Sequence, residues 1–109
     1  MNLLFIELSY FSKYRTETLT DDEYRALQNE LLENPEKGDL IQGLNGLRKI
    51  RIADNKRNKG KRGGARVIYY YYSSQSTIYF LTAYSKDEMT DLTSEDKKTL
   101  KSIVALLKK

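Results

Sequence analysis

Basic side chains are concentrated in one stretch of this sequence, from Leu44 to Arg66. They are Arg48, Lys49, Arg51, Lys56, Arg57, Lys59, Lys61, Arg62 and Arg66, and the stretch holds a single carboxylate, Asp54. Its formal charge is therefore +8, whereas the whole chain carries +4, so the remaining residues are acidic overall, at −4. Charge focused in this way attracts polyanions. A solvated loop is the alternative, but the stretch enters two predicted strands, which favours a binding surface.

The residue types that are missing narrow the possible chemistry. The 109 residues include no histidine and no cysteine, so the usual proton-exchanging group near neutral pH and the thiolate nucleophile are both absent. The carboxylates are scattered and form no tight cluster of the kind that holds a divalent ion. The sequence therefore predicts no metal and no cofactor. The lack of cysteine also fits a reducing, cytoplasmic location, and no segment approaches the length of a membrane span.

Arginine, lysine and tyrosine are sufficient for one reaction of a polyanion, the cleavage of RNA. RNA carries its own nucleophile, the 2′-hydroxyl. Cleavage requires activation of that hydroxyl, stabilisation of the extra negative charge at phosphorus, and protonation of the departing 5′-oxygen. The planar guanidinium of arginine suits the second task because it matches phosphate oxygens and stays charged. Without histidine, the two proton transfers must fall to lysine or tyrosine.

The elements that position these residues can be read from hydrophobic patterns. Strands are expected at 3–8, 47–53, 65–73 and 77–84. Helices are expected around 11–15, from a capping box at 20–23 to Asn34-Pro35, and from Thr93, which has Asp96 in the capping-box position. The chain is long enough for one core. This order predicts a single α+β domain over residues 1–109, with helices packed on a small, largely antiparallel sheet.

Alternation along the strands predicts which face each side chain occupies. Lys49 and Arg51 should lie on one face, and Arg48 should share the other with Ile50 and Ile52. The strand at 77–84 poses a conflict, since Tyr84 and Lys86 fall in phase with apolar residues that should be buried. Either that strand ends or bulges near Thr82, or both faces of the sheet are partly covered. The tyrosines of 69–72 are expected mainly to pack within the sheet.

Four short motifs occur in a characteristic order. These are Gly46-Leu47-Arg48-Lys49-Ile50-Arg51-Ile52, then Lys61-Arg62-Gly63-Gly64-Ala65-Arg66-Val67-Ile68-Tyr69-Tyr70, then Leu81-Thr82-Ala83-Tyr84-Ser85-Lys86-Asp87-Glu88, and finally Asp91-Leu92-Thr93. Together they resemble the RelE/HigB superfamily of toxins from type II toxin–antitoxin modules, and look closest to its HigB-like branch. The resemblance covers nearly the whole chain. It implies a RelE-like fold with N-terminal helices on one face of the sheet and a C-terminal helix.

The resemblance also implies a function and a set of site residues. The family's activity is metal-independent endonucleolytic cleavage of mRNA on the translating ribosome. Arg51 and Arg66 match the positions that hold the scissile phosphate, and Lys49 or Lys86 would exchange the proton. Tyr84 is expected to position or stack a base. Contact with mRNA and ribosomal RNA is expected from the remaining cations of the basic stretch: Arg48, Lys56, Arg57, Lys59, Lys61 and Arg62. Some family members use a tyrosine near the C-terminus, and this chain has none there.

Partners and alternatives follow from the same resemblance. It implies inhibition by a cognate antitoxin, HigA-like with a helix-turn-helix domain, through which the toxin would reach operator DNA indirectly. A ParE-like poison of DNA gyrase would share the fold but needs no cleavage chemistry, and the cluster of cations favours the nuclease. A non-catalytic RNA-binding module of the RRM type is a third possibility. Its alternating glycine and aromatic signature is absent here.

Overall fold

The fold is known from a computed structural model that describes residues 2–53, 64–86 and 91–108. The elements are β1 (Leu4–Glu7), α1 (Ser9–Thr18), α2 (Asp21–Glu33), β2 (Asp39–Leu40), β3 (Leu47–Ile52), β4 (Ala65–Tyr72), β5 (Thr77–Ser85) and α3 (Ser94–Leu107), with a short 3₁₀ turn at Ser73–Gln75 between β4 and β5. The predicted α+β class and order of elements are confirmed. The two-residue strand β2 is an addition to the predicted elements, and it is too short to leave a pattern in the sequence.

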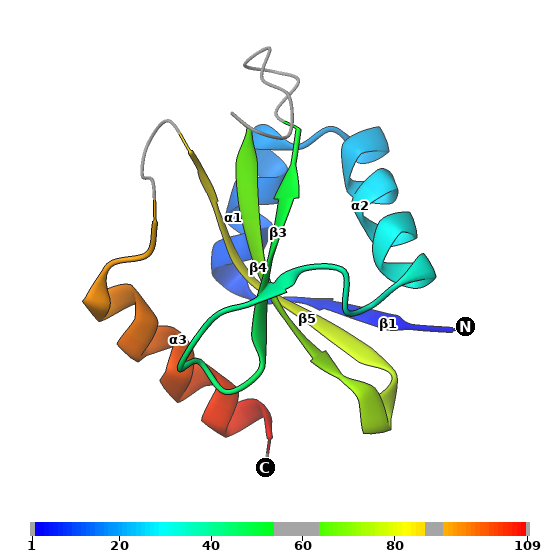
Figure 1. The fold of residues 1–109 in the computed structure, drawn as a ribbon. Helices are drawn as coiled ribbons and strands as arrows, with labels where there is room; N and C mark the ends of the chain where they lie inside the picture. Colours follow the sequence, from blue (N-terminus) through cyan, green and yellow to red (C-terminus); the bar gives the residue numbers. More distant parts are fainter. Residues whose placement is uncertain (1, 54–63, 87–90, 109) are drawn as a thin grey trace.

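The strands form one mixed sheet in the order β1-β5-β4-β3-β2. The long strands β3, β4 and β5 pair antiparallel, whereas β1 pairs with β5 in parallel. In Figure 1, α1 and α2 lie on one side of the sheet and α3 lies on the other. Both helix starts predicted from capping boxes are present, because Thr20 and Thr93 accept hydrogen bonds from Glu23 N–H and Asp96 N–H. The sheet therefore has a covered surface on each side.

Two apolar cores result, one on each face of the sheet. The first contains the buried residues of α1 and α2 together with those of one sheet face, and Phe11 stacks on Phe80 with ring centroids 4.7 Å apart. The second joins Leu100 and Val104 of α3 to Leu47, Ile68 and Leu81. Burial of large apolar side chains at roughly 25 cal/mol per Å² is the main stabilising contribution to such a fold.

A β-bulge in β5 resolves the conflict over Tyr84. Tyr69 pairs with Phe80 but Ile68 pairs with Thr82, so Leu81 is an extra residue between them. A bulge of this kind shifts the alternation of side chains by one. Phe80 belongs to the first core and Ala83 packs against it, whereas Tyr84 belongs to the second. The strand thus keeps its apolar residues buried and still turns Tyr84 to the face that carries α3.

Candidate phosphate-binding site

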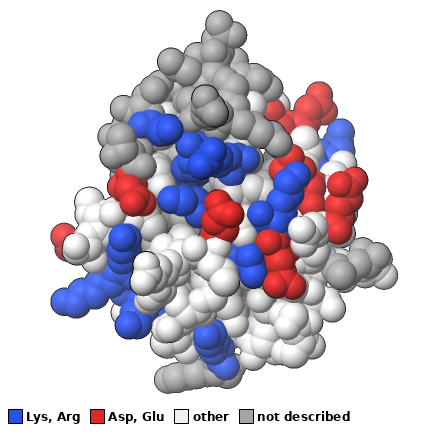
Figure 2. Space-filling view, in the orientation of Figure 1, with Lys and Arg blue, Asp and Glu red and all other residues white. Residues whose placement is uncertain are grey.

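Four cations from three strands meet in one open cavity of about 440 Å³ on the α3 side of the sheet. Its lining residues are Asp39, Leu40, Ile41, Gln42, Lys49, Arg51, Arg66, Lys86, Asp91 and Lys97. Figure 2 shows lysine and arginine side chains gathered on this face around a few acidic ones. The structure therefore brings together Lys49, Arg51, Arg66 and Lys86, all four of the cations that sequence reasoning had assigned to catalysis.

Strand register places the two arginines next to each other. Arg51 of β3 pairs with Arg66 of β4, and Arg66 pairs in turn with Tyr84 of β5. Side chains directly opposite on neighbouring strands are about 5 Å apart at Cβ, and like charges there are destabilising. Such a pair is expected where a ligand supplies the opposite charge. We shall call Lys49, Arg51, Arg66 and Lys86 the cation cluster.

The two arginines differ in their surroundings. Arg66 is only 5% exposed, and its Nη1 donates to the carbonyl of Ala65 at 3.2 Å. Arg51, on the neighbouring strand, is exposed. The guanidinium of Arg66 is therefore largely shielded from solvent and fixed in position. The guanidinium of Arg51 is more accessible. Both arginines line the same cavity, and the guanidinium group matches the geometry of phosphate oxygens.

Backbone contacts fix where Lys86 leaves the sheet. The N–H of Lys86 donates to the carbonyl of Gly64 at 2.9 Å, which ties the end of β5 to the start of β4. The side chain of Lys86 is exposed and lines the cavity. The predicted convergence of the end of β5 with the two basic strands is therefore seen in the fold.

Asp91 is a site residue that sequence reasoning did not identify. Its carboxylate lies 3.8 Å from Nζ of Lys49. A hydrogen bond from the Leu92 N–H, and then the charges of Lys49 and Lys97, hold the pKa of Asp91 below its ordinary value. Lys97 also lines the cavity. Asp91 and Lys97 flank the capping box at Thr93. Polar side chains are common near a helix start, so the local sequence does not indicate that these two belong to a site.

Tyr84 does not line this cavity but lines a separate one, of about 330 Å³, beside α3. It is 7% exposed, belongs to the second core, and its hydroxyl makes no hydrogen bond to any residue that the structure describes. Burial and the charge of Asp91 raise the pKa of this phenol, and Arg66 opposes the shift. The phenol therefore keeps its proton near neutral pH. Its ring is largely buried, so little of it is available to a base in the cavity of the four cations.

Arg48, another predicted contact, does not line this cavity. Arg48 takes part in a network on the opposite face, donating to the carbonyls of Glu36 and Gly38 and pairing with the Glu36 carboxylate at 3.1 Å. Its role is to hold the connection between α2 and β2. The predicted loop contacts Lys56, Arg57, Lys59, Lys61 and Arg62 lie outside the described residues.

The described residues hold neither a group of metal ligands nor a helix that could span a membrane. Residues 2–53, 64–86 and 91–108 contain no group of three or more carboxylate, histidine or cysteine side chains able to hold a metal ion. Within those ranges, each helix is too short or too polar to cross a membrane.

Comparison with known proteins adds evidence independent of this geometry. A family model described as the RelE toxin of the RelE/RelB toxin–antitoxin system matches residues 5–109. The fold is similar to that of a double mutant of the E. coli toxin RelE in the free state, with a TM-score of 0.58 and 15% identity, covering 83% of this chain and 90% of that one. It is also similar to the isolated E. coli RelE toxin, with a TM-score of 0.54 and 13% identity, covering 94% and 99%. At these identities the structural matches establish likeness of fold.

Proposed function

Because the chain belongs to the RelE toxin family, we propose that it is a toxin which cleaves mRNA on the translating ribosome and so inhibits translation. The single observation that carries the nuclease assignment is the cation cluster, which lines one cavity. Neutralisation by a cognate antitoxin goes with membership of a toxin–antitoxin family. We propose further that this antitoxin is HigA-like and carries a helix-turn-helix domain. We also propose that the basic residues of 56–62 contact ribosomal RNA.

In the reaction we propose, the 2′-hydroxyl oxygen of one nucleotide attacks the adjacent phosphorus. The bond from phosphorus to the 5′-oxygen of the next nucleotide breaks, leaving a 2′,3′-cyclic phosphate on one fragment and a 5′-hydroxyl on the other. The hydroxyl proton passes to a basic group, and a proton is delivered to the departing oxygen. No metal is needed, since the negative charge that builds up at phosphorus is balanced by side-chain cations.

The residue roles that we propose are mostly those that the family resemblance implies, and the position of these residues in one cavity supports them. Arg66 and Arg51 bind the phosphate oxygens, and Arg66 is the better fixed of the two because it is buried. Lys49 or Lys86 exchanges the proton, while Asp91 orients Lys49 through their 3.8 Å ion pair. For Tyr84 we replace base stacking with a positioning role behind Arg66, since its side chain is buried and pairs with Arg66 in register.

The decisive experiment compares Arg66→Ala with the wild-type chain after induction in cells. RNA 5′ ends on translating ribosomes are mapped for both, and Arg25→Ala is the control. Arg25 is an exposed arginine of α2 that pairs with Asp22 at 3.3 Å, far from the cavity. We expect in-frame mRNA cuts with the wild type and with Arg25→Ala, and a loss of about 10²- to 10³-fold with Arg66→Ala.

Other outcomes would overturn the proposal in different ways. Cuts that persist undiminished in Arg66→Ala would remove the catalytic assignment. Growth arrest with intact mRNA and broken DNA would favour a ParE-like gyrase poison. Absence of any toxicity, with RNA still bound in vitro, would favour a non-catalytic RNA-binding module.

A further inference from the structure

A second basic cavity adjoins the cation cluster and runs along α3. It has a volume of about 660 Å³ and lies between the first two turns of α3 and the segment that connects β2 to β3. Its lining includes Gln42, Gly43 and Leu44 on one side and Lys97, Lys98 and Lys101 on the other. We shall call it the α3 groove. Two of its residues, Gln42 and Lys97, also line the cavity of the cation cluster, so the two hollows are continuous.

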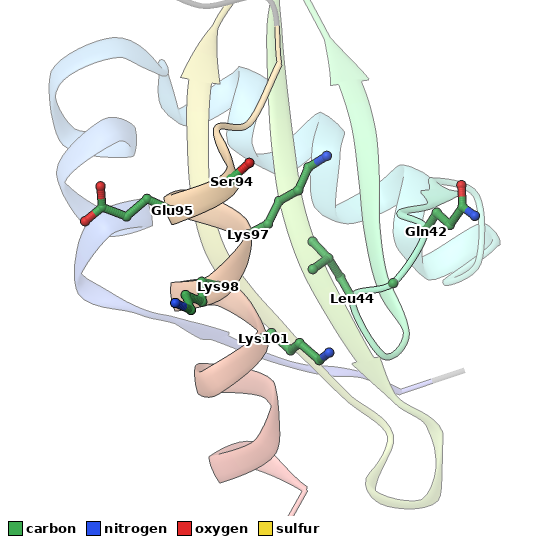
Figure 3. Close-up of a pocket in the computed structure, with 8 residues that line it drawn as sticks. Gln42, Leu44, Ser94, Glu95, Lys97, Lys98 and Lys101 are labelled. Atoms are coloured by element: carbon green, nitrogen blue, oxygen red, sulfur yellow. The ribbon is translucent and has the colours of Figure 1, made fainter.

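The charge of the α3 groove is positive and is left largely unbalanced. Lys97, Lys98 and Lys101 contribute three cations, and Glu95 is the one acidic residue in the lining. Figure 3 shows Lys97 and Lys101 extending from α3 toward the segment that carries Gln42 and Leu44, whereas Glu95 extends to the opposite side of the helix. Among the residues that the structure describes, none of the three lysines forms an ion pair with a carboxylate.

The spacing of these lysines suits a chain of regularly spaced negative charges. Lys97 and Lys101 are four residues apart and lie on the same face of α3. Four residues advance an α-helix by about 6 Å, which is close to the spacing between neighbouring phosphates in an extended nucleic-acid strand. Leu44, buried in the second core, provides an apolar floor between these charges and the sheet. Regularly spaced cations above an apolar floor are suited to bind a sugar–phosphate backbone without regard to its base sequence.

We propose that the α3 groove binds the RNA strand flanking the scissile phosphate. The phosphate at the cation cluster would be followed by one near Lys97 and another near Lys101. This inference rests on the proposed function for the identity of the ligand. Continuity with the phosphate cavity favours RNA over an acidic protein segment, because a strand held at Arg51 and Arg66 has to leave the cavity, and Lys97 and Gln42 stand at one of its exits.

The test measures binding of fluorescent RNA oligonucleotides of two lengths to the full chain. Both are 2′-O-methylated, so that the nucleophile is blocked and no cleavage occurs. One is a dinucleotide, whose single phosphate can fill the cation cluster only, and the other, of about twelve nucleotides, can fill both sites. Lys101→Gln is compared with wild type, and Lys13→Gln is the control. Lys13 is an exposed lysine of α1, on the other side of the sheet, and its substitution removes the same charge.

We expect Lys101→Gln to weaken binding of the long oligonucleotide by roughly three- to tenfold at low salt, and to reduce the slope of log K against log salt by about 0.7. Binding of the short one should change no more than it does in Lys13→Gln. Equal losses for both lengths, or no loss, would overturn the proposal. So would unchanged RNA binding together with weakened binding of the antitoxin, which would assign the groove to that protein.

Failure of this proposal and failure of the proposed function give different results. If Arg66→Ala abolishes cleavage while Lys101→Gln leaves long-RNA binding unchanged, the nuclease assignment stands and the α3 groove has another role. If Arg66→Ala cleaves normally but Lys101→Gln shows the length-dependent loss, the groove binds RNA and the catalytic assignment is wrong. We expect circular dichroism of Lys101→Gln to match that of the wild type, because Lys101 is exposed.

Discussion

The two arginines of the cation cluster carry the same charge but differ in how firmly the surrounding protein holds their side chains. Arg66 is 95% buried, so its guanidinium is held by its surroundings, whereas Arg51 is exposed. A buried guanidinium that binds phosphate through two donors cannot be replaced by an ammonium without loss of that geometry. An exposed one contributes mainly its charge. The burial of each side chain therefore sets how far lysine can substitute for arginine.

This difference predicts unequal effects of a charge-conserving substitution. Arg66→Lys should lower the rate of mRNA cleavage by about 10²-fold or more, because a preorganised donor pair is typically worth about 3 kcal/mol. Arg51→Lys should lower it by roughly tenfold or less. Single-turnover cleavage on programmed ribosomes measures both rates, and thermal unfolding shows whether each variant is folded. Equal losses for the two variants would contradict the assigned roles.

Sequence reasoning located the cations of the site better than their neighbours. Arg51 and Arg66 were assigned from the family resemblance, and alternation placed Lys49 with Arg51 and put Arg48 on the other face. Asp91 and Lys97 could not be found in this way. Their part in the site depends on where the connection from β5 brings the start of α3, which is a long-range feature with no local signal.

At the level of elements, the connection from α2 to β2 is fastened to the sheet by one buried side chain. The Tyr69 hydroxyl donates to the carbonyl of Pro35 at 2.8 Å and accepts from the N–H of Gly38 at 2.9 Å. A side chain on Gly38 would collide with this ring, since an added Cβ would lie 2.9 Å from Tyr69 Cε1. The contact keeps β2 beside β3, and the segment that follows β2 forms one wall of the cavity.

Removal of that hydroxyl should therefore destabilise the protein. Tyr69→Phe leaves the buried Gly38 N–H and Pro35 carbonyl without their partner, at a cost of about 1–3 kcal/mol in the free energy of unfolding. Tyr71→Phe, two residues along on the same face, is the matched control and should change it by less than about 0.5 kcal/mol. Urea unfolding of the three proteins measures the difference. A change in Tyr69→Phe no larger than in the control would refute the bonding assigned to this hydroxyl.

The bulge in β5 marks the limit of what the strand pattern could predict. The apolar residues of 77–84 required a buried strand, but Tyr84 fell in phase with them. Sequence left open whether the strand ended, bulged or was covered on both faces. In the structure it both bulges at Leu81 and is covered on both faces. That choice depends on pairing with β4, and a bulged residue has no distinctive composition.

For the molecule as a whole, tyrosine ionisation links stability to alkaline pH. Burial raises the pKa of Tyr24, of Tyr69 and of Tyr84 above the ordinary value of 10.0. A hydrogen bond to Glu7 adds to the shift at Tyr24. In the unfolded chain these phenols ionise near pH 10. Above that pH the folded state binds more protons than the unfolded state, so the free energy of unfolding must fall as pH rises.

We therefore expect full stability from these groups below about pH 10 and a progressive loss above it. Urea unfolding at a series of pH values from about 8 to 11.5 measures this slope, and ultraviolet absorbance of the phenolates follows ionisation directly. Tyr69→Phe should show a shallower loss than the wild type, because one of the shifted groups is gone. A flat response in the wild type would show that the phenols are not held protonated by the fold.

The pairing of Arg51 with Arg66 has a consequence for the protein in the absence of any ligand. Arg51 and Arg66 stand directly opposite each other on β3 and β4, and like charges at such positions disfavour the folded state. An anion that enters relieves this repulsion, so polyanion binding and folding support each other. Salt is then expected to have two effects: screening weakens the binding of a polyanion, and it also reduces the repulsion between the two arginines. High salt therefore weakens polyanion binding and, at the same time, lowers the electrostatic cost of the folded state.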